Sequence, residues 1–563
     1  MEIQDANSSS SISSEIEIPF RIKRSRRFIL SSDETSDETF EVTARHRLKS
    51  RRIVSSTETE DEAPNITDDL PDQWINPRGN QPSVLPFIGT RGITLVDYLC
   101  AEEEFYLLFV TEEMFEDIAE QTNIYAMQVL TQKRSCRLDK WIPTNKSEIK
   151  KLFGLLIWMG LVKLPEINLY WSKDPIFAQN FPPSVMPRNR FEILLRMLHF
   201  VNNENANPED RLTKMRPIID KLKENFAKYY DPPEMICIDE SIIPFRGRVV
   251  FKQYMKQKKH RYGVKLFKLC FKPGYTYNFQ IYCGQQSGKE RTTPKAVVMT
   301  LCQNIFDKGH TLCVDNWYSS IDLAEELIAR NTHLIGTIRS NRKRIPKEVV
   351  QKKLRRGEIY AKERKDGITL MKWKDKRDVL LVSTKHSVET AVVNKKGYDV
   401  VKPKLVIDYN EVKSSVDVSD QMAAYSNPLR KTIKWYKKVA FELFLNTSVI
   451  NAWILFNTQQ HSSISIVEFR KRLVNYLCYC EDNNNNLSPE IAKTSRKRHE
   501  IKKQKGKAVN VRKRCASCYK KNVKQYGTEV ARQKTKRVVT FCSDCPNKPF
   551  LCIPCFKKIN HYL

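Results

Sequence analysis

The sequence has neither a secretory signal nor a long apolar run. Its first twenty residues are rich in Ser and acidic side chains and contain no apolar core, so a signal peptide is not expected. The most apolar short stretch, residues 152–162 between Lys151 and Lys163, is about half as long as a helix that crosses a bilayer. No internal repeat is visible. These features exclude a secreted or membrane-spanning protein and predict a soluble, intracellular one.

Acidic residues are scarce relative to basic ones. Lys and Arg number 96 against 65 Asp and Glu, a formal net charge of +31. Such a charge favours an anionic polymer as partner, and nucleic acid fits best, although a basic face can also be merely solvated. Residues 487–563 hold 21 basic and 4 acidic side chains, whereas residues 1–85 hold 11 and 16. This asymmetry predicts tails of opposite charge around a folded core.

Composition and periodicity divide the chain into eight segments. Residues 1–86 are rich in Ser, Thr, Asp, Glu and Pro and lack apolar periodicity, so we expect them to be disordered. They contain a possible kinase target at 31–39 and basic clusters at 21–27 and 45–52 that suit nuclear import receptors or DNA. The other segments are two helical stretches (87–234 and 430–481), two parts of a sheet domain (235–340 and 406–429), an insertion (341–405), a basic linker (482–511) and a cysteine-rich end (512–563).

The first part of the sheet domain has the pattern of a mixed sheet. The strand-like runs MICID, YGVKLFKLCF and YTYNFQIYCG precede a helix near 295–305, the strand HTLCVD, a helix and the strand THLIGTIRS. This β-β-β-α-β-α-β order is that of ribonuclease H-like folds. We therefore predict a mixed α/β protein with a ribonuclease H-like core, an insertion, flanking helices and a small terminal domain.

Three aspartates follow short, strand-like runs: Asp239 in ICID, Asp315 in LCVD and Asp417 in SSVD. A lone Asp at such a place is most often a turn former or helix cap. In a ribonuclease H-like sheet, however, the first and fourth strands are adjacent, so Asp239 and Asp315 share one edge and a later helix can add Asp417. Clustered carboxylates favour Mg²⁺ or Mn²⁺, and a pair of such ions suits in-line phosphodiester attack. Asp420, one helical turn on, either joins the cluster or hydrogen-bonds its ligands, while Glu240 should point to the opposite face.

Five ordered motifs resemble those of the piggyBac family of DDE/D transposases. They are IDESIIPFRGR (238–248), YGVK (262–265), VDNWYSSIDLAEEL (314–327), GTIRSN (336–341) and VDVSDQM (416–422). The stretch 87–125 is similar to the opening segment of that family, and the resemblance covers most of residues 87–563. One departure lies before Asp417, where the family often has two glycines and this chain has Ser414 and Ser415.

The resemblance implies a function and a site. It implies cut-and-paste transposition of double-stranded DNA with transient hairpins and insertion at TTAA. We predict a nuclear protein that is a homodimer when assembled on DNA. The helical segments then form a dimerisation and DNA-binding domain around the catalytic core. The implied active site consists of Asp239, Asp315 and Asp417 as ligands of Mg²⁺, with Asp420 as a supporting acid.

Cations cluster near the proposed metal edge, in RGR (246–248), KQKKHR (256–261) and RSNRKR (339–344). Phosphate neutralisation by such residues gives salt-sensitive, sequence-independent affinity. The resemblance implies that Arg339 and Arg342 hold target DNA and that Trp435 stacks or wedges at DNA, although Trp435 can equally pack within its amphipathic helix. The candidate DNA-binding residues are Arg246, Arg248, Arg339, Arg342, Lys343, Arg344 and Trp435.

The chain ends with three CxxC pairs and one histidine. An intracellular protein is expected to keep its 15 cysteines as thiols or metal ligands, and clustered CxxC pairs predict Zn²⁺. The resemblance implies a cross-brace domain with two zinc ions that binds transposon ends. Such a domain needs eight ligands, so Asp544, His499 or a water would have to complete a set of seven: Cys515, Cys518, Cys542, Cys545, Cys552, Cys555 and His561.

Other functions are weighed against transposition. A chromatin or DNA-binding protein that keeps the transposase fold without transposing is the main alternative. A ribonuclease H-like nuclease leaves the cysteine-rich end and the helical flanks unexplained. A ubiquitin-ligase RING domain is disfavoured at the C-terminus, because the flanking RKRHEIKKQKGK and VRKR suit DNA better.

Overall fold

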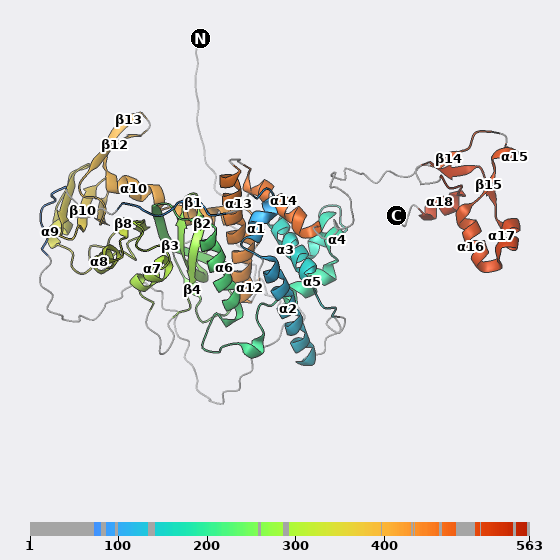
Figure 1. The fold of residues 1–563 in the computed structure, drawn as a ribbon, viewed down its shortest axis with the longest axis horizontal. Coiled ribbons are helices and arrows are strands. Elements are labelled where there is room, and N and C mark those ends of the chain that lie inside the picture. The colour runs from blue at the N-terminus through green and yellow to red at the C-terminus, as the bar shows by residue number, and fades with distance from the viewer. Residues whose placement is uncertain are drawn as a thin grey trace, which may run out of the picture. The chain divides into compact units, whose positions relative to one another are not determined.

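The computed structural model describes residues 73–79, 86–95, 99–132, 141–256, 260–284, 292–395, 397–428, 432, 434–460, 464–479, 501–506, 508–543 and 548–559 (Figure 1). The candidate ligands Cys545 and His561 lie outside these residues, as do Asp544 and His499. The same holds for the kinase and import motifs of residues 1–72 and for most of the predicted basic linker.

A nine-stranded mixed sheet forms the centre of the fold. Its order is β4-β5-β3-β7-β8-β11-β10-β9, with β6 paired to β5. Parallel pairing joins β3 to β7 and β7 to β8, and all other neighbours are antiparallel. The strands are β3 Met235–Pro244, β4 Gln253–Tyr254, β5 Tyr262–Phe271, β6 Tyr275–Ile281, β7 Thr311–Val314, β8 His333–Thr337, β9 Ile359–Glu363, β10 Thr369–Lys374 and β11 Asp378–Ser383.

The central strands follow from their sequences. β7 is fully buried along TLCV, and β3 is almost continuously apolar before its aspartate, as expected for parallel strands that are covered on both faces. The predicted strand and helix order is observed as β3, β5, β6, α7 (Pro294–Cys302), β7, α8 (Ile321–Ala329) and β8, with the short β4 added. The mixed α/β architecture predicted from the sequence is confirmed.

The insertion extends this sheet. The apolar runs ITLMKW and DVLLVST of the insertion form β10 and β11, and β9 completes that edge of the sheet. β12 (Thr390–Lys395) and β13 (Tyr398–Pro403) form a separate antiparallel hairpin. β9, β12 and β13 have weak strand signals, because each has only two or three apolar residues in a row or interrupted by a charged side chain.

One short stretch of the segment predicted to be disordered is ordered. Ile75 exchanges two backbone hydrogen bonds of 2.9 Å with Glu363 at the outer edge of β9. Trp74 packs against the main core. The prediction of disorder for residues 1–86 is therefore wrong for residues 73–79, because an apolar pair there covers an otherwise open sheet edge.

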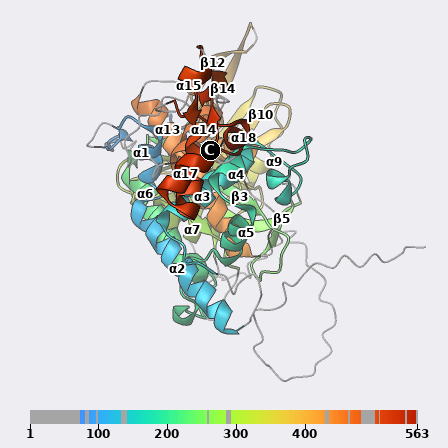
Figure 2. The ribbon, with the colours of Figure 1, turned by 90° about the vertical axis from the view of Figure 1, so that its right-hand side faces the viewer.

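Helices from both ends of the described core pack together. They are α1 Glu102–Leu107, α2 Glu112–Gln132, α3 Lys146–Leu161, α4 Phe181–Val185, α5 Arg188–Met197, α6 Arg216–Lys228, α12 Trp435–Glu442, α13 Ser448–Gln459 and α14 Ile466–Tyr479. Figure 2 shows the long α2 in blue. Short 3₁₀ turns lie at Asn168–Trp171, Asn203–Asn205 and Thr213–Met215, and β1 (Gly92–Ile93) pairs with β2 (Tyr230–Asp231).

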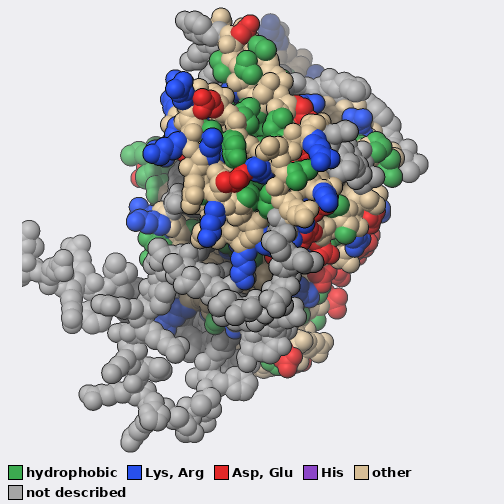
Figure 3. Space-filling model, turned by 90° about the vertical axis from the view of Figure 1, so that its left-hand side faces the viewer, with side chains coloured by type: hydrophobic (Ala, Val, Ile, Leu, Met, Phe, Trp, Pro, Cys, Tyr) green, Lys and Arg blue, Asp and Glu red, His purple; other side chains and the backbone are tan. Residues whose placement is uncertain are grey.

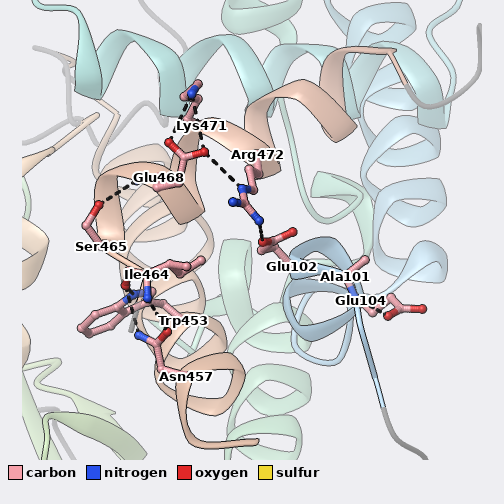
Figure 4. A network of polar contacts seen from close by, with 10 residues as sticks. All are labelled: Ala101, Glu102, Glu104, Trp453, Asn457, Ile464, Ser465, Glu468, Lys471 and Arg472. Carbon is pink, nitrogen blue, oxygen red and sulfur yellow. Dashed lines mark hydrogen bonds and ion pairs between the residues drawn. The ribbon is translucent and has the colours of Figure 1, made fainter. Parts of the chain in front are cut away.

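A polar network ties α1 to α14 across more than 360 residues of sequence (Figure 4). Arg472 on α14 bonds Glu102 at 2.5 Å and Glu468 at 3.1 Å. The indole nitrogen of Trp453 donates to the carbonyl of Ile464 at 2.8 Å, which positions the turn into α14. The two helical stretches of the sequence therefore meet in space.

The helical run Trp435–Gln459 is a core element. It is long and apolar enough to cross a membrane by length and composition, but 94% of its most apolar window is buried within the protein. A π-helical turn at Leu443–Thr447 separates α12 from α13, and every residue of that turn is buried. π-turns of this kind are frequent at functional sites.

The cysteine-rich end is a set of small elements. They are β14 Ile501–Lys503, α15 Ala508–Val511, β15 Lys513–Arg514, α16 Ala516–Tyr526, α17 Thr528–Lys534, β16 Arg537–Val538, β17 Thr540–Cys542 and α18 Ile553–Ile559. β14 pairs with β17 and β15 with β16. Their apolar cluster contains mainly the cysteines, Leu551, Val538 and Phe556, which is too little to hold such a unit without a metal.

Candidate active site

The sheet register brings the first two aspartates to one level. Cα partners of the parallel pair β3–β7 run from Met235 and Thr311 to Ile238 and Val314. Asp239 is the next residue of β3 and Asp315 directly follows the end of β7, and both are half-buried. Adjacent parallel strands point equivalent side chains to the same face, so the predicted sharing of one sheet edge is what the register produces.

The face to which these aspartates point is covered by α10 (Lys404–Val412) and α11 (Ser415–Tyr425). Cys237 donates to the carbonyl of Lys413 at 3.5 Å, and Cys313 donates to that of Tyr409 at 3.8 Å. Because side chains two residues apart share a face, Asp239 lies on the side of Cys237.

α11 brings the other two acids to this face. Asp417 lies in its first turn and is exposed, whereas Asp420 is half-buried against the sheet. Oδ1 of Asp420 accepts hydrogen bonds of 2.8 Å from Ser241 Oγ on β3 and from Lys268 Nζ on β5. Asp239 and Asp315 share this face, and Asp417 lies in the first turn of the helix that covers it. The three do not close into a cage, since among the described residues only four cysteines have ligand atoms all within 4.8 Å of one another.

The serines before Asp417 fit their positions. Ser414, the residue before α11, has φ −92° and ψ 6°, a conformation open to any residue. Ser415 is buried and donates from Oγ to the carbonyl of Val412 at 2.8 Å. Nothing in this backbone requires the glycines that the family often has here.

Asp315 is held by the loop that follows it. Its Oδ1 accepts from the backbone N–H of Asn316 and, at 3.5 Å, from Thr337 Oγ1. Two of the predicted DNA-binding arginines clamp this loop: Arg339 Nε donates to Asn316 Oδ1 at 3.1 Å, and Arg342 Nη2 donates to the carbonyl of Trp317 at 2.5 Å. Both side chains are half-buried, which gives them a structural role beside any contact with DNA.

Arg342→Ala is expected to lower DNA cleavage more than DNA affinity. The guanidinium holds the loop after Asp315, and misplacement of a reacting group by about 1 Å costs on the order of a hundredfold in rate. Single-turnover cleavage and equilibrium binding to the same duplex measure the two effects. The matched control is Lys343→Ala at the exposed neighbour, which should weaken binding and its salt dependence with little effect on the rate. Equal losses of rate and affinity in the Arg342 variant would contradict the clamp.

The remaining DNA-binding candidates differ in exposure. Arg246 is exposed and Arg248 half-buried. Arg344 forms ion pairs with Asp322 at 2.8 Å and Glu325 at 2.7 Å. Trp435 begins α12 and packs edge-on against Phe251, with ring centroids 5.2 Å apart.

Two lysines of β5 pair with acids near the site, Lys268 on the face of Asp239 and Lys265 on the opposite face, and neither is among the residues predicted from the sequence. Lys265 pairs with Glu240 at 3.3 Å, and its ammonium lies 4.7 Å from the ring centroid of Trp317. Glu240 is the Cα partner of Phe267, and it points away from the face of Asp239, as predicted. Lys268 is the Cα partner of Asp239 and is 1% exposed. A lysine inside the apolar run LFKLCF was the signal for this residue.

Four cysteines of the terminal segment form a ligand cage. The Sγ atoms of Cys515, Cys518, Cys552 and Cys555 all lie within 4.8 Å of one another. Sulfur–sulfur distances are 3.7 Å for Cys515–Cys552 and 3.3 Å for Cys518–Cys555, close to the roughly 3.8 Å of a tetrahedron with 2.3 Å Zn–S bonds. Burial raises the pKa of the Cys515 thiol, but N–H groups of Cys518 and Cys552 outweigh this and lower it, which favours a thiolate.

The pairing of the CxxC motifs is alternating. The cage joins the first pair to the third, so the second pair is left for a different ligand set. Cys542 of that pair is buried at the end of β17, while Cys545 and His561 lie outside the described residues.

Comparison with known protein families gives one extended match. A family model described as Transposase IS4 matches residues 101–453, which is more than half of the chain. Human PiggyBac transposable element-derived protein 3 is 27% identical over 442 residues, covering 73% of this chain and 71% of that protein. Human PiggyBac transposable element-derived protein 2 is 24% identical over 396 residues, covering 67% of this chain and 64% of that protein.

A solved structure has the same overall fold. It is the cryo-EM structure of a piggyBac transposase synaptic complex with hairpin DNA. The TM-score is 0.62 at 25% sequence identity, and the match covers 72% of this chain and 85% of that one.

Proposed function

From the premise that this chain belongs to the Transposase IS4 family and is a piggyBac-type DDE/D transposase by sequence and fold, we propose that it cleaves and joins DNA. The reaction is cut-and-paste transposition: strand cleavage at transposon ends followed by insertion at TTAA. The core that performs it is of the ribonuclease H type, for which the order β6-β5-β3-β7-β8 is the supporting feature.

One observation carries the proposal. The parallel register of β3 and β7 sets Asp239 and Asp315 at the same level, and Asp417 lies in the first turn of α11, the helix that packs over their face. Single aspartates at strand ends are common, but three acids from segments 76 and 102 residues apart in the sequence meet at one face only when the fold gathers them. A purely structural role explains no such convergence.

The donor set fits a divalent cation with hard-oxygen preference. Asp239, Asp315 and Asp417 would hold Mg²⁺ or Mn²⁺, since carboxylate oxygens suit both ions and Mg²⁺ keeps several of its waters. When bound, the ions would activate the attacking oxygen and stabilise the leaving one. The chain itself orients these acids: Arg339 and Arg342 hold the loop of Asp315.

Surface charge supports DNA as the partner. Figure 3 views the side of the molecule that lies at the left of Figure 1 and shows Lys and Arg side chains spread across it. A hydrogen bond of 2.8 Å from Gly357 to Lys374 brings the start of β9 beside the β10–β11 turn. The exposed cations of the insertion include Lys352, Lys353, Arg355, Arg356, Lys365, Lys376 and Arg377, which can neutralise phosphates over a long track.

The terminal cysteines extend the proposal to zinc. Cys515, Cys518, Cys552 and Cys555 would hold one ion, and Cys542, Cys545 and His561 would contribute to a second. The unit so formed would bind transposon ends through its basic flanks, with the protein acting as a homodimer in the nucleus.

The decisive experiment is cleavage of the element's own ends. Purified protein with Mn²⁺ or Mg²⁺ is incubated with labelled duplexes that join the terminal repeat to a TTAA flank, and products are separated on denaturing gels. We expect a metal-dependent nick at the repeat boundary and a hairpin on the next step. Binding without any nick in either metal would reject the transposase proposal.

A second candidate is a DNA-binding protein that keeps this fold without transposing. The names of the two human relatives above describe them as transposable element-derived, and this description favours a non-transposing protein as the second candidate. For this chain it predicts binding to terminal repeats without cleavage, and a gene that lacks matching terminal inverted repeats flanked by TTAA.

A further inference from the structure

A buried lysine lies within the acid cluster. Lys268 is in the middle of β5, is 1% exposed, and is the Cα partner of Asp239 across the antiparallel pair. Its side chain therefore shares the face that carries the proposed metal ligands. A buried ammonium is costly unless a carboxylate and hydrogen bonds compensate for the lost water, so its partners determine what it does.

The main partner is Asp420 on α11. Lys268 Nζ lies 2.8 Å from Asp420 Oδ1, and the same oxygen accepts from Ser241 Oγ at 2.8 Å. One carboxylate oxygen thus joins β3, β5 and α11. Burial lowers the pKa of Lys268, but Asp420 and the buried Glu442 outweigh it and raise that pKa above its ordinary value, so the ammonium stays charged.

A second buried cation holds the far end of the same helix. Arg470 on α14 is 0% exposed and donates to the carbonyl of Ser426, the residue after α11, at 3.3 Å. It also reaches the π-turn, through the carbonyl of Leu445 at 3.2 Å and Asn446 Oδ1 at 3.3 Å. Asn446 in turn donates to Glu442 at 2.9 Å. Buried ion pairs and hydrogen bonds thus fasten α11 at its middle and at its end.

We propose that Lys268 and Asp420 are positioning residues, a fixed ion pair that sets α11, and with it Asp417, against Asp239 and Asp315. Asp420 serves Lys268 and Ser241 and is not a metal ligand. The inference rests on the proposed metal-dependent function of the site and assigns to one of its acids a role different from that of the other three.

The charge balance of the site supports this assignment. The ammonium of Lys268 neutralises Asp420, which leaves Asp239, Asp315 and Asp417 as the acids available to cations. A second consequence concerns cation binding: removing Lys268 deletes a positive charge, so electrostatics alone cannot weaken metal affinity in its absence. Any loss of metal affinity in a Lys268 variant would therefore report the displacement of Asp417 and not the loss of the charge.

The first test does not depend on catalysis. Thermal unfolding of the full chain is measured with and without saturating Mn²⁺ for the wild type, Asp417→Asn and Asp420→Asn. An asparagine oxygen at position 420 can still accept from Ser241 and Lys268, so α11 keeps its place in Asp420→Asn. We therefore expect Mn²⁺ to raise the melting temperature of the wild type and of Asp420→Asn by the same amount, and that of Asp417→Asn by clearly less. An Asp420→Asn protein that loses the shift as Asp417→Asn does would overturn the inference. A wild type without any shift would instead reject the metal centre itself.

The second test separates rate from metal affinity. At saturating DNA, Lys268→Met should lower the maximal cleavage rate by about a hundredfold, while the Mn²⁺ concentration for half-maximal rate rises by clearly less than in Asp417→Asn, because Asp417 is displaced but still present. Lys268→Arg should recover most of the rate, because a cation again reaches Asp420. The control is Lys272→Met, an exposed lysine four residues on that pairs with Glu411 at 3.0 Å, and it should leave both quantities unchanged.

Two results of this second test contradict the positioning role. In one, the Mn²⁺ concentration for half-maximal rate in Lys268→Met rises to the value measured for Asp417→Asn. In the other, the rate for Lys268→Arg is as low as that for Lys268→Met, with both proteins folded. If Lys268→Met does not fold, Lys268→Arg and Asp420→Asn decide the question, since both keep a polar partner at the pair.

Discussion

Asp239→Asn and Asp315→Asn are each expected to abolish strand cleavage, by on the order of a thousandfold or more, while the protein remains folded and bound to DNA. Asparagine keeps the size and hydrogen-bonding shape of the side chain but removes the charge that a divalent cation requires. Both residues lie at the same level of two adjacent parallel strands. Each should therefore disable the same site.

The double variant sharpens this prediction. Residues that act on one step as a unit are strongly non-additive, so Asp239→Asn combined with Asp315→Asn should be no slower than either single variant. Asp307→Asn is the matched control, because Asp307 is exposed, pairs with Arg330 at 3.1 Å and has a φ of 66° that asparagine tolerates. Gel assays of end cleavage give the rates, and circular dichroism verifies folding. Wild-type rates in either single variant would refute the assignment.

Cys515→Ser is expected to remove one zinc ion per chain and to unfold the elements around the four-cysteine cage. The four Sγ atoms of the cage lie within 4.8 Å of one another, while the apolar cluster around them is small. Structural zinc contributes about 10 kcal/mol or more to folding in such units, so the remaining contacts cannot replace it.

Metal analysis and limited proteolysis measure the two effects. Zinc per chain should fall by one in Cys515→Ser and by one in Cys542→Ser, with both ions lost in the double variant, because the cage joins only the first and third CxxC pairs. Cleavage of residues 501–559 by protease should become rapid. Cys100→Ser, at an exposed free thiol, is the control. Unchanged zinc content in Cys515→Ser would exclude the cage as the site.

Much of the core was predictable because its signals are local. The strands that lead to Asp239 and Asp315 are short apolar runs, and the residues around Asp417 have the spacing of a helix. The order of these elements along the chain therefore follows from the sequence pattern alone. The ordering of Trp74 and Ile75 was not predictable in this way. These residues are ordered by the edge of β9, which is far away in sequence and itself gave only a weak strand signal.

The roles of the arginines and lysines show the same division. Arg339 and Arg342 were recognisable as cations near the site, but their bonds to the loop of Asp315 depend on how β8 meets β7. Lys268 stands in an apolar run, and its sequence neighbours give no partner for it. The carboxylate that pairs with Lys268 is that of Asp420, which lies 152 residues away in the sequence, on α11.

The sequence by itself determined the family resemblance, the mixed α/β class, the identities of the three candidate metal ligands and the presence of zinc-type CxxC pairs. Only the tertiary structure decided that the first and third CxxC pairs share a cage, that the insertion extends the central sheet, and that Asp420 forms an ion pair with Lys268. The physical reason is that spacing and periodicity record what each segment prefers alone. Ion pairs, edge pairing and ligand cages are interactions between distant segments, which exist only after the backbone has brought them together.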